Sequence, residues 1–468
     1  MNKLKSWLSI PLILLIGAIG IQTISSCAKI DDDPLSLPSP DDPEAIAEFL
    51  NAYSSDGSNS DGSSNSNASS PVATYGALKA CGKYICGSKT GTTPVQVRGV
   101  SFFWSNTGWG GDKFYNATVV NSMVDDWKAQ IVRAAMGYSE SGGYKTDASN
   151  WTRAKAVVDA AIAKGVYVII DWHSHDAHNE KAAATTFFTQ TVSEYHNNPH
   201  VIFEIYNEPL NTTSWSTIRT YAQDVISSIR SAGANNLILV GTPSWSANPN
   251  LAMASPLTDD NVAYVFHFYA ASHTTSTHSS NITTVLNNNK PIFVSEYGTT
   301  HYDGGNPNEG NYNTHSAANT DAWHTFMDNN KISSCAWSIT DKYEGSAFFG
   351  TSNSGIGTIN AANLADPSKM TASGKYIYNK LKDYAANSGD GTSNGNGGEV
   401  SLTRCKNASN QDYYCNWGTG CFAIDPAFAE STGDCNELVT ECRLYGNGLY
   451  VNSSVEGLGI SCNGTRVL

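Results

Sequence analysis

Short apolar runs alternate with longer amphipathic segments through the middle of the chain. The apolar runs are rich in β-branched and aromatic residues and end at polar or turn residues, which is typical of buried β-strands. Eight such runs lie at 97–103, 131–136, 166–171, 201–206, 237–241, 262–268, 291–297 and 333–339. The segments between them have helical spacing, and those at 151–164 and 214–232 are each followed by a glycine, a common helix terminus. The pattern predicts a strand followed by a helix, repeated eight times.

An α/β fold with this repeat has few possible architectures. A strand and a helix repeated over roughly 250 to 300 residues are typical of a (β/α)8 TIM barrel. A doubly wound open sheet would also accommodate these strands, but its binding site usually has a glycine-rich turn after the first strand, and none follows Phe103. We therefore predict that residues 76–386 form a TIM barrel with functional side chains at the C-terminal ends of its strands.

The N-terminus has the pattern of an export signal. Residues 1–26 begin with a basic segment containing Lys3 and Lys5 and continue with an apolar stretch at 7–21 that is short for a membrane span. The end of this segment, Ile-Ser-Ser before Cys27, resembles a bacterial lipobox, which implies cleavage before Cys27 and lipidation of its sulfur. The alternative is an ordinary signal peptide with a chance cysteine. We predict that the protein is secreted or lies at the cell surface. More specifically, we expect a bacterial outer-membrane lipoprotein whose contact with the membrane is its lipid anchor.

Two low-complexity segments divide the rest of the chain. Residues 27–75 are acidic and then rich in Ser, Asn and Gly, and residues 387–399 are rich in Gly, Ser and Asn, so both are expected to be flexible linkers. Residues 400–468 are predicted to be a separate small disulfide-rich module. Its cysteines are Cys405, Cys415, Cys421, Cys435, Cys442 and Cys462. Its aromatic residues could form a flat surface that binds polysaccharide, or the core of a domain that binds an attachment partner.

The remaining cysteines have different expected roles. Cys81 and Cys86 lie in a hairpin-like segment before the first predicted strand, where a disulfide is expected in an exported protein. Cys335 lies among small and apolar residues of the last predicted strand. We expect it to be a buried, inert thiol and not a nucleophile.

Composition narrows the class of ligand. The chain has 468 residues and a formal net charge of -14, from 28 Lys and Arg against 42 Asp and Glu, which argues against binding nucleic acid. Aromatic residues make up 10% of the chain and include 11 Trp, and sugars stack on such rings. A neutral polysaccharide fits this composition better than a polyanion.

Two glutamates stand at the ends of predicted buried strands. Glu208 follows the strand at 201–206, and Glu296 lies near the end of the strand at 291–297. A carboxylate after an apolar run is costly to desolvate unless it is paired or used, so two such sites predict a common cavity. Two facing carboxylates are the working groups of glycosidases, whereas the alternative is a salt bridge at a loop rim for each. Glu204, inside the same strand, is expected to be a paired structural carboxylate.

Further polar and aromatic residues fall at the predicted strand ends. They are Arg133, His173, Asn207, His267, Tyr269 and Trp337, followed by the segment 338–344. With Glu208 and Glu296 they resemble glycoside hydrolase family 5, a clan A TIM-barrel family, and within it the bacterial endo-β-1,4-glucanase, or cellulase, branch. The resemblance runs from about residue 75 to 386. In one departure, residues 101–104 lack the histidine that this branch often carries after its first strand.

The resemblance implies distinct roles for the two glutamates. Glu208 matches the proton donor and base, and Glu296 matches the nucleophile of a hydrolysis that retains configuration, with no cofactor and no metal ion. A retaining enzyme needs its two carboxyl groups about 5 to 5.5 Å apart. We expect Arg133 to lie near Glu296 and to keep it ionised. Glu208, in contrast, should be held neutral by nearby negative charge and partial burial.

The resemblance also implies a set of substrate contacts. Asn207 would hydrogen-bond the sugar 2-hydroxyl, which requires an irregular strand end because adjacent residues normally face opposite ways. His267 and Tyr269 are two residues apart on one strand face and would flank the acid and the nucleophile, respectively. His173 would contact the substrate. Trp337 would form the platform under the reacting sugar, with a following peptide bond that is often cis in the family.

The outer contacts are less determined. Lys342 and Glu344 match residues that bind the glucan beyond the cleavage point, and the alternative is a charged pair on a surface loop. Further stacking candidates, each of which could equally be a packing residue, are Trp104, Trp109, Trp172 and Trp245. His173, His175 and His178 could suggest a metal site, but no carboxylate-rich octahedral set accompanies them, so we expect none.

These patterns predict a glycosidase on a TIM barrel, and the resemblance implies a monomeric, retaining endo-β-1,4-glucanase that hydrolyses internal bonds of cellulose and related β-glucans. A β-mannanase, or a xyloglucan or mixed-linkage glucanase of the same family, is the alternative, because loops choose the sugar. An alternative of another class is a noncatalytic surface glycan-binding protein that keeps the barrel as a scaffold. The presence of both Glu208 and Glu296 argues against that class.

Overall fold

The computed structural model describes residues 70–356 and 359–387, together with the backbone of short strands between 403 and 467. The predicted signal segment, the lipidation site at Cys27 and most of the first linker lie outside the described residues. Among the helices that are described, none is both long and apolar enough to cross a membrane.

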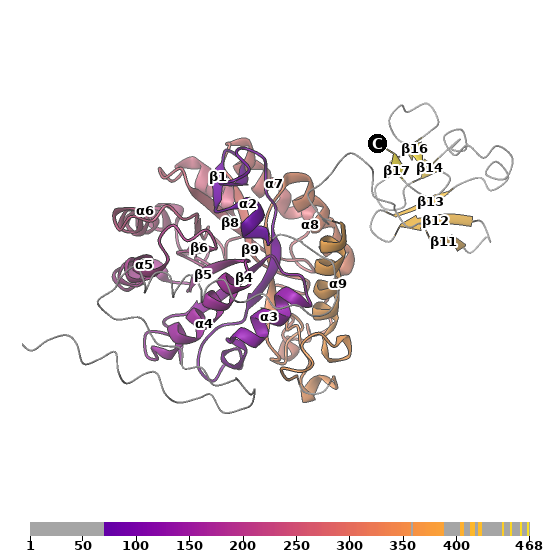
Figure 1. Cartoon of the computed structure of the whole chain (residues 1–468), viewed down its shortest axis with the longest axis horizontal. Helices are drawn as coiled ribbons and strands as arrows, with labels where there is room; N and C mark the ends of the chain where they lie inside the picture. Colours follow the sequence, from indigo (N-terminus) through magenta and orange to yellow (C-terminus); the bar gives the residue numbers. More distant parts are fainter. Residues whose placement is uncertain are drawn as a thin grey trace, which may run out of the picture. The chain divides into compact units, whose positions relative to one another are not determined.

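Eight parallel strands close into a barrel, in the order of the chain, with the last strand pairing with the first (Figure 1). The strands are β3 (Arg98–Phe102), β4 (Ile131–Gly137), β5 (Tyr167–His173), β6 (Val201–Glu204), β7 (Ile238–Val240), β8 (Val262–Tyr269), β9 (Ile292–Gly298) and β10 (Ser334–Ile339). All eight predicted strands are present, so the predicted TIM barrel is confirmed. β6 ends earlier than predicted, at Glu204, which frees the residues after it from strand alternation.

Helices surround the barrel (Figure 1). They are α3 (Ala117–Asp125), α4 (Ser149–Ala163), α5 (Lys181–Tyr195), α6 (Trp215–Ser231), α7 (Thr275–Asn287), α8 (Ala317–Asn330) and α9 (Ala372–Asn387), after a short α2 (Pro71–Tyr75). Short 3-10 helices are η1 (Asp112–Phe114), η2 (Ala177–Glu180), η3 (Pro249–Ala254), η4 (Pro307–Glu309), η5 (Ser352–Ser354) and η6 (Pro367–Lys369). The prediction that a helix follows every strand is wrong for one connection. The connection from β7 to β8 carries η3 instead of an α-helix, because prolines 243, 249 and 256 interrupt this segment.

Helix ends follow the local sequence. Ser214 caps α6, with its side chain accepting a hydrogen bond from the Thr217 amide. Gly165 and Gly233, which follow α4 and α6, have positive φ angles of 75° and 94°. These are left-handed conformations that glycine adopts without strain, so the predicted helix ends are confirmed.

The barrel interior changes from apolar to charged along the strand direction. Its floor is packed with inward-facing apolar side chains, including Ile131, Ile169, Ile202, Leu239, Val265 and Phe293. Two residues further along four of these strands, the same inward face carries Arg133, Asp171, Glu204 and Ser295, all fully buried. The outward faces pack against the helices in a separate large apolar cluster. The fold therefore places a buried polar layer directly below the C-terminal ends of the strands.

A hairpin packs at the N-terminal end of the barrel. It consists of β1 (Leu78–Cys81) and β2 (Tyr84–Gly87), is closed by a disulfide between Cys81 and Cys86, and contributes Leu78 and Ile85 to the floor cluster. The Ala80 amide donates to the side chain of Asn261, just before β8. Cys335 is free and fully buried, and burial raises the pKa of its thiol. Both predictions about these cysteines are confirmed.

In the C-terminal segment the backbone of three small antiparallel sheets is described. β11 (Thr403–Lys406), β12 (Asp412–Asn416) and β13 (Gly420–Ala423) form one, β14 (Cys442–Arg443) and β15 (Tyr450–Val451) a second, and β16 (Gly459–Ile460) and β17 (Arg466–Val467) a third. The disulfide pairing and the role predicted for this segment lie outside what is described.

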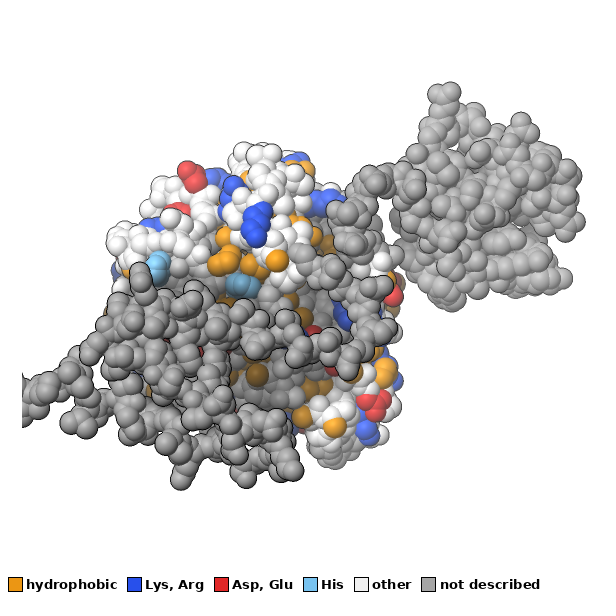
Figure 2. All heavy atoms as spheres, in the orientation of Figure 1, with side chains coloured by type: hydrophobic (Ala, Val, Ile, Leu, Met, Phe, Trp, Pro, Cys, Tyr) orange, Lys and Arg blue, Asp and Glu red, His pale blue; other side chains and the backbone are white. Residues whose placement is uncertain are grey.

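On the part of the barrel surface coloured in Figure 2, acidic and basic side chains are interspersed.

Gly99 in β3 tests how tightly the barrel is closed. A Cβ at this position would overlap the carbonyl oxygen of Ile131 on the neighbouring β4. We expect Gly99→Ala to separate these strands and to lower the free energy of unfolding by about 3 kcal/mol. Urea denaturation would measure this loss.

The control for that variant is Gly91→Ala. Gly91 lies in a turn with φ 68°, and a Cβ at this position would have no neighbouring atom within 4 Å. The substitution should therefore cost about 1 kcal/mol, from its backbone angle alone. Equal losses in the two variants would contradict the close packing of β3 against β4.

Candidate active site

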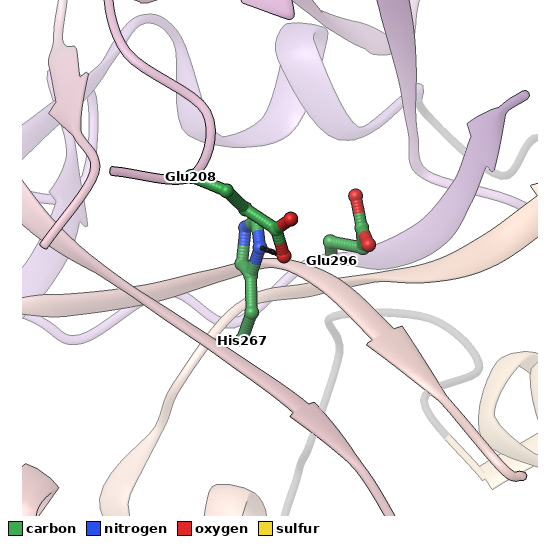
Figure 3. Close-up of side chains that lie close together, drawn as sticks. All are labelled: Glu208, His267 and Glu296. Carbon is green, nitrogen blue, oxygen red and sulfur yellow. Dashed lines mark hydrogen bonds and ion pairs between the residues drawn. The ribbon is translucent and has the colours of Figure 1, made fainter. Parts of the chain in front are cut away.

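The two predicted catalytic glutamates face one another at the C-terminal end of the barrel (Figure 3). Glu208 lies after β6 and Glu296 lies in β9. One carboxylate oxygen of each, with a ring nitrogen of His267 from β8, lie within 4.8 Å of one another. This separation is compatible with the short spacing of about 5 to 5.5 Å between the carboxyl groups of a retaining glycosidase.

The same atoms are close enough to hold a metal ion, but their partners favour proton chemistry. The guanidinium of Arg133 donates from Nη1 to Oε2 of Glu296 at 2.9 Å, and this cation would repel a metal ion at that oxygen. The hydroxyl of Tyr269 donates to Oε1 of Glu296 at 2.8 Å. Burial and the charge of Glu296 raise the pKa of Tyr269 well above its usual value, so this hydroxyl remains a donor. Each oxygen of Glu296 therefore accepts a hydrogen bond, one from a guanidinium and one from a tyrosine hydroxyl.

Arg133 connects the buried acids of the barrel interior. Its Nε lies 2.7 Å from Oε2 of Glu204, its Nη2 lies 2.9 Å from Oδ2 of Asp171, and its Nη1 contacts Glu296. Burial disfavours the charge on Arg133, but these three carboxylates outweigh burial and raise its pKa well above the usual value. Glu204 is thus a paired structural carboxylate, as predicted. Asp171 is not among the predicted site residues; burial raises its pKa to about 7, against the opposing charge of Arg133.

Asn207 has one end fixed and the other free. Its Oδ1 accepts a hydrogen bond of 2.6 Å from Nη2 of Arg133, and its buried Nδ2 has no partner among the described residues. Because β6 ends at Glu204, the irregular backbone that follows lets Asn207 and Glu208 both face the site. The predicted irregular strand end is confirmed, and it leaves an amide donor without a partner beside the two carboxylates.

Each oxygen of Glu208 contacts an imidazole. Nδ1 of His267 lies 2.9 Å from Oε1, and Nε2 of His175 lies 3.2 Å from Oε2. Burial raises the pKa of Glu208, but the hydrogen bonds with His175 and His267 outweigh burial and hold it below its usual value. The expectation that nearby negative charge and partial burial hold Glu208 neutral is therefore wrong. The carboxylate of Glu296 does lie within 4.8 Å, but the contacts with the two imidazoles lower the pKa of Glu208. In return, Glu208 raises the pKa of His175 against the effect of burial.

His175 and Ser295 are site residues that the sequence reasoning missed. His175 comes two residues after His173, and the sequence suggests it for a metal site alone. Ser295 immediately precedes Glu296, and normal strand alternation would turn it away from the site. The pairing of β9 with β8 shifts between Phe293 and Glu296, so that β9 has one extra residue there and both Ser295 and Glu296 face inward. A bulge of this kind has no sequence signal here.

His173 and Trp337 form the wall beside this cluster. The Nδ1 of His173 lies 2.6 Å from Oδ2 of Asp171, and burial keeps the pKa of His173 well below its usual value, so the ring is neutral. The ring of Trp337 lies parallel to that of His173, with centroids 5.5 Å apart, and Trp104 meets His173 edge-on. The peptide bond between Trp337 and Ser338 is cis. The structure thus brings His173 and Trp337 to the same site, as predicted.

Lys342 and Glu344 lie at the edge of the site. They form an ion pair of 2.8 Å, in which Glu344 is buried and Lys342 is half exposed. The ammonium of Lys342 lies over the ring of Phe103, 4.8 Å from its centroid. The charge of Glu344 contributes to the raised pKa of Tyr269, which places this pair close to the catalytic cluster.

The stacking candidates separate into two groups. Trp172 is fully buried and packs against Tyr138 and Phe187, so the suggestion that it stacks on a sugar is wrong. Trp245 is 45% exposed, and its amide donates to the carbonyl of Pro209, next to Glu208. Trp104 and Trp109 are half-buried and lie against one another.

The three histidines considered as a metal site have separate partners. His173 contacts Asp171 and His175 contacts Glu208, whereas His178 contacts the hydroxyl of Tyr206. Among the described residues, the set with spacing suited to a metal ion is Glu208, His267 and Glu296, which includes none of these three histidines.

Known proteins share this sequence over most of the barrel. The family model described as "Cellulase (glycosyl hydrolase family 5)" matches residues 88–343. Endoglucanase Z of Dickeya dadantii is 44% identical over 304 residues, covering 65% of this chain and 66% of that protein. Endoglucanase E-5 of Thermobifida fusca is 32% identical over 330 residues, covering 67% of this chain and 65% of that protein. The chain therefore spans slightly less than two thirds of the length of these curated relatives.

Solved structures share the fold over the same part of the chain. A structure from Cytophaga hutchinsonii is 38% identical, with a TM-score of 0.61, and covers 67% of this chain and 97% of that chain. A variant of the catalytic domain of the Thermobifida fusca endoglucanase Cel5A, in complex with cellotetraose, is 30% identical with a TM-score of 0.59 and covers 67% of this chain and 99% of that chain.

The buried network around Arg133 gives a prediction about stability. Arg133→Met would leave Asp171, Glu204 and Glu296 without their shared cation in a desolvated site, and we expect the free energy of unfolding to fall by about 3 to 5 kcal/mol. Chemical denaturation at neutral pH would measure the change. Lys164→Met is the control, because its ion pair with Asp125 is partly exposed and should contribute less than about 1 kcal/mol. Similar losses for the two variants would contradict the role of Arg133.

Proposed function

This chain belongs to the cellulase family of glycosyl hydrolases, family 5, and we propose that it is a retaining endo-β-1,4-glucanase acting on cellulose and related β-glucans. The observation that carries the proposal is the facing pair Glu208 and Glu296, with oxygens within 4.8 Å and different surroundings. An arginine and a tyrosine hydroxyl contact Glu296, whereas two imidazoles contact Glu208. This difference suits one nucleophile and one acid.

The first step forms a bond to Glu296. Its carboxylate attacks the anomeric carbon, while Glu208 donates a proton to the glycosidic oxygen that leaves. Arg133 and Tyr269 hold the attacking carboxylate in place through Oε2 and Oε1. The free Nδ2 of Asn207 donates to the sugar 2-hydroxyl, a contact that strengthens in the transition state.

The second step releases the sugar. With the carboxylate of Glu296 now in an ester, Glu208 accepts a proton from water, which attacks the same carbon and restores both glutamates. His173, His267 and Trp337 shape the pocket around the reacting sugar, and Lys342 with Glu344 binds the chain further from the cleavage point. No cofactor or metal ion takes part in these steps.

The choice of β-1,4-glucan over other polysaccharides is the finer part of the proposal. It is supported by the relatives, which are named endoglucanases, and by the cellotetraose complex of the Thermobifida fusca enzyme. A β-mannanase, or a xyloglucan or mixed-linkage glucanase, would use the same catalytic pair with different loops.

Location is a further part of the proposal. We propose that residues 1–26 direct export and that Cys27 carries a lipid, which would leave the enzyme on the bacterial cell surface. Residues 400–468 would then be a module that binds polysaccharide or an attachment partner. The support for these assignments is the sequence pattern.

Glu296→Ala tests the catalytic assignment. We expect this variant to lose hydrolysis of carboxymethylcellulose, because no carboxylate remains to form the ester. Azide should then restore turnover of an activated aryl glycoside by entering the vacant space and giving the glycosyl azide with inverted configuration. The matched control is Glu309→Ala, in the exposed η4, which should retain full activity. Full activity in Glu296→Ala would overturn the proposal.

Digestion of several polysaccharides tests the substrate class. We expect reducing ends to appear with carboxymethylcellulose and lichenan, and at rates at least tenfold lower with mannan, because the pocket must discriminate the 2-hydroxyl configuration through Asn207. Reducing-sugar assays on these substrates and on xyloglucan would measure the order. Cleavage of mannan alone would contradict the glucanase assignment and leave the catalytic pair intact.

A further inference from the structure

A chain of hydrogen bonds connects Glu208 to the buried interior of the barrel. His267 lies 2.9 Å from Oε1 of Glu208 through Nδ1, and its other nitrogen, Nε2, lies 3.0 Å from the hydroxyl of Ser295. The Ser295 hydroxyl donates to Oε1 of Glu204 at 2.6 Å. The other three residues in this series of hydrogen bonds, His267, Ser295 and Glu204, are buried, and His267 is 2% exposed.

The direction of these bonds determines which nitrogen of His267 carries hydrogen. A serine hydroxyl has one hydrogen, and the shorter contact directs it to the carboxylate of Glu204. Glu204 is available as an acceptor because Nε of Arg133 contacts its other oxygen at 2.7 Å. Burial raises the pKa of Glu204, whereas Arg133 opposes that effect. With its hydrogen engaged, Ser295 accepts from His267, so Nε2 carries a hydrogen.

We propose that Ser295 and Glu204 are positioning residues that hold His267 with hydrogen on Nε2, so that its Nδ1 shares a proton with Oε1 of Glu208. A neutral ring in this tautomer has a lone pair on Nδ1 and cannot donate to a carboxylate. The contact between His267 and Glu208 therefore contains a proton while the enzyme is active as an acid. This inference rests on the proposed acid role of Glu208.

The arrangement has a consequence for the basic side of the pH profile. Loss of the shared proton would leave the Nδ1 lone pair facing a carboxylate, which is unfavourable, so the pair retains its proton to higher pH. Without Ser295, the neutral ring can move its hydrogen to Nδ1 and donate to the carboxylate, which stabilises the deprotonated pair. Removing the hydroxyl of Ser295 should therefore shift the basic limb of the pH profile of activity to lower pH.

Other titratable groups face the pair formed by His267 and Glu208, and a substitution at Ser295 leaves these groups in place. They come from the strands and loops around it and are Arg133, Asp171, His173, His175, Tyr269, His273 and Glu296. These groups act on the wild type and on the variants alike. A difference between their pH profiles of activity therefore results from loss of the hydrogen bonds that connect His267 to Glu204 through Ser295.

The test compares Ser295→Ala with Ser295→Thr, which restores a hydroxyl. We expect the basic limb of kcat/KM on cellotetraose to fall by roughly one pH unit in Ser295→Ala, the size of a hydrogen bond to a charged group, and to recover in Ser295→Thr. An aryl cellobioside with a dinitrophenyl leaving group needs no acid, so its kcat/KM should change much less. Ser334→Ala, at a buried serine of β10, is the control and should leave both profiles unchanged.

A second measurement does not depend on activity. Nitrogen-15 NMR of histidine-labelled protein, above the basic limb, should show His267 with hydrogen on Nε2 in the wild type and on Nδ1 in Ser295→Ala. An unshifted or raised basic limb in folded Ser295→Ala, or hydrogen on Nδ1 in the wild type, would overturn the inference. Inactivity of the wild type towards glucans would instead overturn the proposed function and leave the NMR result to decide the tautomer.

Discussion

The buried guanidinium of Arg133 is the interaction on which the rest of the site depends. Asp171, Glu204 and Glu296, from three other strands, each lie within 2.9 Å of one of its nitrogens. Three carboxylates in one desolvated layer would repel one another, and without a cation they would take up protons or open the barrel. A guanidinium suits this position because its planar set of donors reaches several partners at once, whereas an ammonium is a compact point charge. One residue of β4 thus allows three strands to direct acids inward.

The apolar floor of the barrel strengthens the electrostatic interactions of these charged groups, because it excludes water beneath them. Ile131, Ile169, Ile202 and Phe293 fill the interior below the charged layer, and the β1–β2 hairpin packs at that end. The charged layer is therefore closed off from the N-terminal end of the barrel by apolar side chains. In such surroundings a charge or a hydrogen bond acts more strongly than at a surface, and the donors are already oriented before the reaction begins. The alternation of side chains along the strands thus links the apolar packing of the barrel to the chemistry at its mouth.

Much of this arrangement could be predicted from the sequence, because it depends on strand ends. Glu208, Glu296, His267 and Tyr269 each follow an apolar run, and a parallel barrel brings all such positions together. What the sequence could not show depends on backbone irregularity and on packing. The bulge that lets Glu296 face inward directly after Ser295 has no composition of its own, and Trp172 at a strand end is a core residue. The expected helix between β7 and β8 failed for a visible reason, since prolines interrupt that connection.

Backbone irregularity also explains why the two glutamates differ. Where β6 ends early, Glu208 follows Asn207 into the site and meets two imidazoles, which can exchange a proton with it. Where β9 bulges, Glu296 follows Ser295 inward and accepts hydrogen bonds from a guanidinium and a tyrosine hydroxyl. Two regular strands would have turned one residue of each pair away. The different surroundings of the two carboxylates therefore arise from where each strand departs from regular geometry, and these contacts support the acid role proposed for Glu208 and the nucleophile role proposed for Glu296.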